Sequence, residues 1–337
     1  MYTELVILVL GISLVLYMIL GGADFGAGII ELFLGNKSNS TVSKAMAPVW
    51  EANHMWLIIA IVILFNGFPK AYTTLSTNLH IPVLIFLIAL VFRGAAFTFR
   101  HYDAYQDKSA ELYSYIFRYS SLVAVFFLGV TISAFFGGTI PSSNLGSFTE
   151  LYISPWFNFF SISVGVFLVT LSAYIAAIFL LGEVDSDEEY KLLSKFSVRL
   201  FFLSVISGIA IFISSYFSGL IFHELFFSHP LAEIAGIIAT ALVPLIFIFI
   251  KKRKTWKLRF IVGFQIVIIM IQWLVIQWPN LILFSNGSTL SIYDAAAPTI
   301  TMKILFYALA IGVVIIFPSL FYLFKLFKSE SNIHQKL

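Results

Sequence analysis

Residues 48–68 have the sequence PVWEANHMWLIIAIVILFNGF. The last twelve of them, residues 57–68, are almost wholly apolar, and Glu51, Asn53 and His54 lie directly before this run. A helix that crosses a bilayer needs about 20 mostly apolar residues. The stretch therefore predicts a membrane span whose entrance carries a carboxylate, an amide and an imidazole. Ionisable groups in such segments are costly, and by default they are candidates for ion or proton paths.

The composition of the whole chain agrees with a membrane protein. Of 337 residues, 60% are hydrophobic and 11% are charged, whereas soluble domains have about 25% charged residues. No basic segment precedes the first apolar run, so we expect a retained span rather than a cleaved signal peptide. The absence of cysteine excludes disulfides and thiolate metal sites. Nothing in the chain predicts nucleic-acid binding.

Nine stretches are long and apolar enough to span a membrane. Because lipid offers the backbone no hydrogen-bond partners, each span must satisfy its own backbone groups, which predicts an all-α fold. No room remains for a soluble domain, so we expect residues 1–337 to form a single polytopic membrane domain. The predicted spans are roughly 5–31, 50–68, 80–98, 114–136, 155–181, 199–221, 231–250, 258–278 and 302–326.

The distribution of basic residues predicts the orientation. All Lys and Arg residues except Lys70 and Lys303 fall in or beside alternate loops, or in the C-terminal tail. Cytoplasmic loops carry the excess of positive charge. The N-terminus is therefore expected outside and the C-terminus in the cytoplasm, which requires an odd number of spans, as the count of nine provides.

The polar residues near the cytoplasmic side form one candidate site. At 1.5 Å per residue, Asp24 lies about 28 Å into the first span, near the level at which Glu51 begins the second. His54 shares a helix face with Glu51, and Trp50 and Asn53 form a neighbouring pair. Glu51 is either a proton-handling group or an acid that stabilises the helix N-terminus in the headgroup zone. The sequence leaves both interpretations open.

Three further groups are candidates with a structural alternative. Gly22 and Gly26 form a GxxxG pair, which indicates either close helix packing or a helix break at an ion site. Arg93 and Arg100 are seven residues apart, hence on one face; each either binds an acidic or backbone partner or extends to the membrane surface. Asp294 is either a functional residue or the N-cap of the final span.

The six histidines lie at span ends or in loops, so no bis-histidine haem site is expected in this chain. They are His54, His80, His101, His223, His229 and His334.

Four blocks in this order resemble one known family. They are GGADFGAG (residues 21–28), APVWEANHMWLI (47–58), FRGAAFTFR (92–100) and STLSIYDA (288–295). Together they resemble subunit II of the cytochrome bd-type quinol oxidases, whose topology is also nine spans with the N-terminus outside. The blocks extend over most of the chain.

The resemblance implies a subunit of a bacterial plasma-membrane enzyme that oxidises quinol and reduces dioxygen to water, generating a membrane potential. Two haems b and one haem d are then expected in a partner, subunit I, and no metal in this chain. Glu51 corresponds to an acid that lines a cytoplasmic proton path in that family, within a block that includes Trp50 and Asn53; Asp24, Arg100 and Asp294 also fall on characteristic positions. The resemblance leaves open the type of quinol, a structurally bound quinone or lipid, and a small accessory subunit.

The chain departs from the family pattern at several positions. Gly21 stands where many members have Asp, Thr98 stands where many have an acid, and alanines follow Asp294 where many have serines. Two alternatives remain beside the oxidase: a secondary transporter, expected to show paired broken helices, and an assembly subunit without a proton role.

Overall fold

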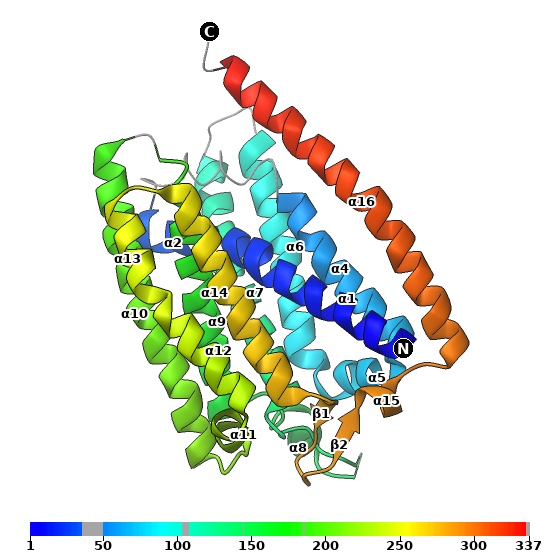
Figure 1. The fold of residues 1–337 in the computed structure, drawn as a ribbon. Coiled ribbons are helices and arrows are strands. Elements are labelled where there is room, and N and C mark those ends of the chain that lie inside the picture. Colours follow the sequence, from blue (N-terminus) through cyan, green and yellow to red (C-terminus); the bar gives the residue numbers. More distant parts are fainter. Residues whose placement is uncertain (36–49, 103–107, 144, 185, 335–337) are drawn as a thin grey trace.

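The computed structural model describes residues 1–35, 50–102, 108–143, 145–184 and 186–334; within its helices, the side chains of residues 50–52, 101–102, 108–110 and most of 317–334 lie outside this description. The described chain is an elongated helical bundle (Figure 1). Its first half contains α1 (Tyr2–Leu16), the π-helical turn η1 (Tyr17–Gly21), α2 (Gly22–Leu34), α4 (Trp50–Gly67), α5 (Pro69–Asn78), α6 (His80–Tyr102), α7 (Lys108–Phe136), α8 (Phe148–Tyr152) and α9 (Phe159–Leu180). Its second half contains α10 (Asp187–Phe217), α11 (Phe222–Ser228), α12 (Pro230–Ala241), α13 (Val243–Lys251), α14 (Thr255–Gln277), β1 (Asn280–Leu283), β2 (Thr289–Ser291), α15 (Ile292–Ala295) and α16 (Thr299–His334).

The predicted helical membrane fold is confirmed. Within the described residues, eight helices are long and apolar enough to cross a membrane, and a ninth span is obtained if the pair α4 and α5 counts as one. That pair is bent by 111° at Phe68, directly before Pro69. Proline cannot donate the backbone bond that would continue α4, so the chain turns there.

The first span is one continuous unit of 33 residues, Tyr2–Leu34, that contains α1, η1 and α2. The helix break considered for the glycine-rich block is wrong: the helix continues through Gly22 and Gly26, and the irregularity is the π turn just before them.

Residues 182–198, which lie between the predicted spans 155–181 and 199–221, are also corrected. Most of them form the first part of α10, which begins at Asp187. The Ser186 hydroxyl accepts a hydrogen bond from the Glu189 backbone N–H, and acids fill the first turn. Both features stabilise a helix N-terminus, so the polar residues from Ser186 to Glu189 begin α10 instead of forming a loop.

A small β-hairpin adds to the all-helical prediction. The antiparallel strands β1 and β2 and the short helix α15 lie in the predicted loop 279–301, and Ile140 forms an isolated bridge to Phe284. This cap lies at one end of the bundle, beside α5 and α8 (Figure 1).

Close packing of α2, α7 and α9 forms the core of the first half. A Cβ on Gly26 would collide with the backbone carbonyl of Ser172 on α9, and one on Gly28 would collide with the Ser121 side chain on α7. The interpretation of Gly26 as a close-packing residue is thus confirmed, whereas a Cβ on Gly22 would meet its neighbours only at ordinary distance, 3.4 Å or more.

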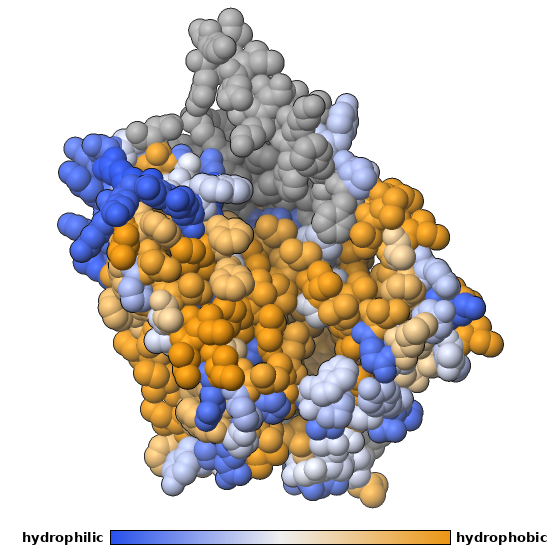
Figure 2. Space-filling view, viewed as in Figure 1, coloured by the Kyte–Doolittle hydropathy of each residue, from blue (hydrophilic) through white to orange (hydrophobic). Residues whose placement is uncertain are grey.

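Hydrophobic side chains cover the middle of the visible face, and hydrophilic ones gather at its two ends (Figure 2). This is the pattern expected of a protein whose middle section faces lipid.

Candidate functional site

A buried ion pair joins the first span to α6. Arg93 Nη2 lies 2.8 Å from Asp24 Oδ1, and the same nitrogen donates a hydrogen bond of 3.0 Å to the Asp24 backbone carbonyl. Arg93 Nε donates to Ser121 Oγ at 3.0 Å. Asp24 is 2% exposed and Arg93 is 1% exposed. The prediction that Arg93 needs an acidic or backbone partner is confirmed with both kinds, and extension to the surface is wrong for it.

His54 approaches the other side of the same carboxylate. Its Nε2 lies 3.5 Å from Asp24 Oδ2, and its ring packs at 5.6 Å, edge to face, against Phe25. Because His54 lies on the first turns of α4, Asp24 connects α6 with the start of the span that carries Glu51. We expected Asp24 to lie at the level in the membrane where the second span begins. Its contact with His54, near the start of α4, confirms this.

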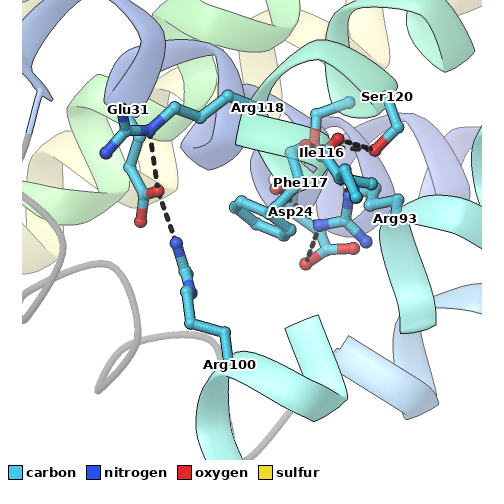
Figure 3. A network of polar contacts seen from close by, with 9 residues as sticks. Asp24, Glu31, Arg93, Arg100, Ile116, Phe117, Arg118 and Ser120 are labelled. Carbon is cyan, nitrogen blue, oxygen red and sulfur yellow. Dashed lines mark hydrogen bonds and ion pairs between the residues drawn. The ribbon is translucent and has the colours of Figure 1, made fainter. Parts of the chain in front are cut away.

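A second buried cluster lies further along the first span. Glu31 is fully buried, and its Oε2 lies 2.7 Å from Arg100 Nη1 and 3.6 Å from Arg118 Nε (Figure 3). The Arg100 side chain is only 8% exposed, so extension to the membrane surface is wrong for this residue too.

The two clusters repeat at the same interval. Asp24 and Glu31 are seven residues apart on α2, as are Arg93 and Arg100 on α6, so two helical turns, about 10 Å, separate the pairs. Helix α7 packs against both α2 and α6, and Phe117 of α7 lies between the two arginines, with its ring 5.0 Å from the Arg93 guanidinium and 4.5 Å from that of Arg100. We call the Asp24–Arg93 and Glu31–Arg100 pairs the ion-pair ladder.

Neighbouring aromatic side chains, rather than solvent, stabilise the ion-pair ladder. Aromatic faces stabilise a guanidinium by cation–π attraction, and the Phe25 ring adds a further contact at 4.8 Å from Arg93. In such burial, each charge depends on its partner, because removing one leaves the other uncompensated.

The remaining predicted residues fall into three groups. Trp50 and Glu51 lie in the first turn of α4, but their side chains are outside the described part of the structure, so the role of Glu51 stays a prediction. Asn53 is 4% exposed, as expected for a residue that faces the bundle. Asp294 is not the N-cap of the final span: it lies in α15, where Ser291 is the N-cap and donates a 2.5 Å hydrogen bond to Asp294 Oδ2. It lies far from the ladder, among the β1–β2–α15 cap.

Glu31, Arg118 and Ser121 belong to the site and were missed. The sequence held a usable signal for Glu31, because its distance of seven residues from Asp24 equals that between Arg93 and Arg100. Arg118 and Ser121 reach the ladder only because α7 packs beside α2, which no spacing along the chain reveals.

The site does not have the composition of a metal centre. Among the described residues, no three His, Cys, Asp or Glu side chains are arranged to hold a metal ion. Every acid of the ladder instead faces an arginine.

Comparisons with known proteins agree with the four sequence blocks. The family model described as cytochrome bd terminal oxidase subunit II matches residues 2–327. Cytochrome bd ubiquinol oxidase subunit 2 of Bacillus subtilis (strain 168) is 31% identical over 157 residues, 46% of either chain. Cytochrome bd-I ubiquinol oxidase subunit 2 of Escherichia coli (strain K12) is 30% identical over 95 residues, 28% of this chain and 25% of that one. The matched stretches thus span about half and a quarter of these two relatives.

The fold has a counterpart among solved structures. A chain in the structure of bd oxidase from Geobacillus thermodenitrificans superposes with a TM-score of 0.75, covering 97% of this chain and 98% of that one at 21% identity. With the family model matching almost the whole length, this chain belongs to the cytochrome bd terminal oxidase subunit II family and is a multi-pass membrane protein of bacteria.

Proposed function

We propose that this chain is the haem-free second subunit of a quinol oxidase that reduces dioxygen to water, and that it supports both assembly and a proton path from the cytoplasm. Family membership supports the first part, and it makes the subunit a better interpretation than the transporter. The proposed partner is subunit I, which would carry two haems b and one haem d. When bound there, the haems would supply electron transfer and oxygen reduction.

Three of the described histidines contact polar groups of this chain. The His54 ring nitrogen nearest the buried cluster faces Asp24 at 3.5 Å, and His80 and His223 hydrogen-bond to Thr77 and Ser215.

One observation carries the proton-path part: His54 and Asp24 face each other inside the bundle, at the helix start that also carries Glu51. A carboxylate at an entrance can collect protons, and an imidazole close to it can accept and release them. Asp24 has a different role, because its carboxylate is ion-paired with Arg93 at 2.8 Å. We assign Glu51 the entrance, His54 the next transfer, and Asp24 the fixed charge that holds His54 in place.

The test replaces Glu51 in the complete oxidase complex reconstituted in liposomes. We expect Glu51→Gln to lower quinol-driven oxygen consumption and potential generation by at least about tenfold at unchanged haem content, since general acid–base groups contribute about 10²–10⁴-fold. Glu111→Gln is the matched control, because Glu111 is an exposed acid near the start of α7. Normal turnover and normal potential in Glu51→Gln would remove this residue from the path.

The ion-pair ladder itself favours a second candidate function, that of an assembly subunit without a proton role. Buried acids that each face an arginine are typical of ion pairs with a purely structural role as well as of proton paths. In that case substitutions of Glu51, His54 and Asp24 would reduce the yield of complex but leave turnover per haem unchanged. The ratio of turnover to haem content therefore separates the two candidates.

A further inference from the structure

A tyrosine extends the buried polar cluster beyond His54. Tyr17 is 5% exposed, and its ring lies 6.1 Å from the His54 ring and 6.3 Å, edge-on, from the Phe25 ring. It therefore packs against the residue that faces Asp24. Its hydroxyl has no hydrogen-bond partner among the described residues.

Unpaired polar atoms are concentrated at this place. Besides the Tyr17 hydroxyl, three atoms have no well-aligned hydrogen bond within the described residues: His54 Nδ1 and the two carboxylate oxygens of Asp24. The Asp24 carboxylate is nevertheless ion-paired with Arg93 and faces His54. Buried polar atoms are rarely left without a partner, and ordered water is a usual one. Three neighbouring side chains with spare hydrogen-bonding capacity are what a bound water needs.

The backbone around Tyr17 is built to place its ring. Tyr17 begins the π turn η1, and π turns inside α-helices occur frequently at functional sites. A Cβ on Gly21 would lie 2.8 Å from Tyr17 Cε2, so any larger residue at position 21 would displace the ring. Glycine at this position thus makes room for the tyrosine.

We propose that Tyr17 is a proton-relay residue that passes protons, through bound water, from His54 toward the middle of the membrane. This inference rests on the proposed function. Tyr17 lies seven residues from Asp24 on the side away from Glu31, about 10 Å along the helix axis. Its oxygen accepts one proton from a bound water on the His54 side while its own O–H proton passes to a second bound water on the opposite side. The hydroxyl is regenerated, and the tyrosine itself stays neutral.

The chain provides a matched comparison for this role. Tyr174 on α9 is also buried, and its hydroxyl also lacks a partner among the described residues. Its ring packs at 5.7 Å against Phe201, and no ring contact joins it to His54. If Tyr17 were only a core aromatic, the loss of either hydroxyl should have the same effect.

The test compares Tyr17→Phe with Tyr174→Phe in the reconstituted oxidase at equal haem content. We expect Tyr17→Phe to slow quinol-driven oxygen consumption at least about tenfold and to increase the ratio of rates in H2O and D2O, whereas Tyr174→Phe leaves both unchanged. Gly21→Ala should reproduce the defect by displacing the ring, and adding it to Tyr17→Phe should cause no further loss of rate.

The outcomes also separate this inference from the proposed function. A defect in Glu51→Gln with wild-type rate and isotope ratio in Tyr17→Phe rejects the relay alone. Equal defects in Tyr17→Phe and Tyr174→Phe, without a change in isotope ratio, also reject it. Wild-type behaviour of both Glu51→Gln and Tyr17→Phe rejects the path and the relay together.

Discussion

At the scale of single residues, Arg93 depends most on its surroundings. Its three described polar partners are the Asp24 carboxylate, the Asp24 carbonyl and the Ser121 hydroxyl. A guanidinium suits this position because its donors form a planar fork and its faces stack on aromatic rings. A lysine could keep the charge but not the set of contacts.

Arg93→Gln is therefore expected to destabilise the subunit by about 3–5 kcal/mol, the usual cost of leaving one member of a buried ion pair alone. Thermal unfolding of the purified complex measures this change in stability, with the amount of assembled protein that remains as the signal. Arg199→Gln serves as control, because Arg199 is exposed on α10. If the Asp24→Asn/Arg93→Gln double variant is no more stable than Arg93→Gln, the uncompensated charge is not the cause.

At the scale of elements, close contact between α2 and α9 depends on Gly26. The carbonyl of Ser172 occupies the space that a side chain at position 26 would need, and a backbone atom cannot rotate away as a side chain can. The helices must separate to accept any larger residue.

Gly26→Ala is expected to cost about 1–3 kcal/mol through overpacking and to lower the yield of assembled complex. Gly263→Ala is the matched control, since Gly263 lies within α14 and a Cβ there would meet no atom within 4 Å. Thermal unfolding and size-exclusion profiles of both variants provide the comparison. Equal losses in the two variants would indicate that glycine in general, rather than this contact, matters.

The short helix α8 carries a pH-sensitive cap. Glu150 Oε2 accepts a hydrogen bond of 2.8 Å from the Ser147 backbone N–H, and this bond, with that to the Ser147 side chain, lowers the pKa of Glu150 below its ordinary value. A group whose folded-state pKa is lowered stabilises the fold above its unfolded-state pKa, about 4.3 for Glu. That contribution disappears as the pH falls through the folded-state value.

Amides at residues 147–153 should thus exchange hydrogen faster relative to the rest of the chain as the pH falls below about 4.3. Glu150→Gln should remove this dependence, because glutamine does not titrate. Hydrogen-exchange mass spectrometry, corrected for the intrinsic pH dependence of exchange, measures it. A persistent pH dependence in Glu150→Gln would assign it to another group.

At the scale of the whole molecule, the orientation in the membrane remains a prediction from the basic residues. The absence of cysteine from residues 1–337 makes it directly testable, because a single introduced cysteine would be the only thiol among them. We expect Lys70→Cys and Lys303→Cys to react with a membrane-impermeant maleimide in intact cells, and Lys191→Cys and Lys252→Cys to react only after lysis. The reverse pattern would place the N-terminus in the cytoplasm and invert the proposed proton path.

The sequence by itself determined the class of the protein and four residues of the candidate site. Apolar length is a local property, and an apolar segment in lipid forms a helix. Most predicted spans therefore match their helices to within several residues, whereas α10 begins earlier, at Asp187, α16 continues to His334, and α5 was not predicted. Asp24, His54, Arg93 and Arg100 could be selected because a charged or titratable group in an apolar segment needs a partner wherever that segment lies.

Only the tertiary structure decided which partners these residues have. Arg118 and Ser121 became part of the site because α7 packs beside α2, and Tyr17 contacts His54 because α4 packs against the π turn. Such contacts join residues that are distant along the chain, and their geometry depends on how helices pack. Hydrophobic length governs whether a helix enters the membrane but says little about which of its faces meets which neighbour.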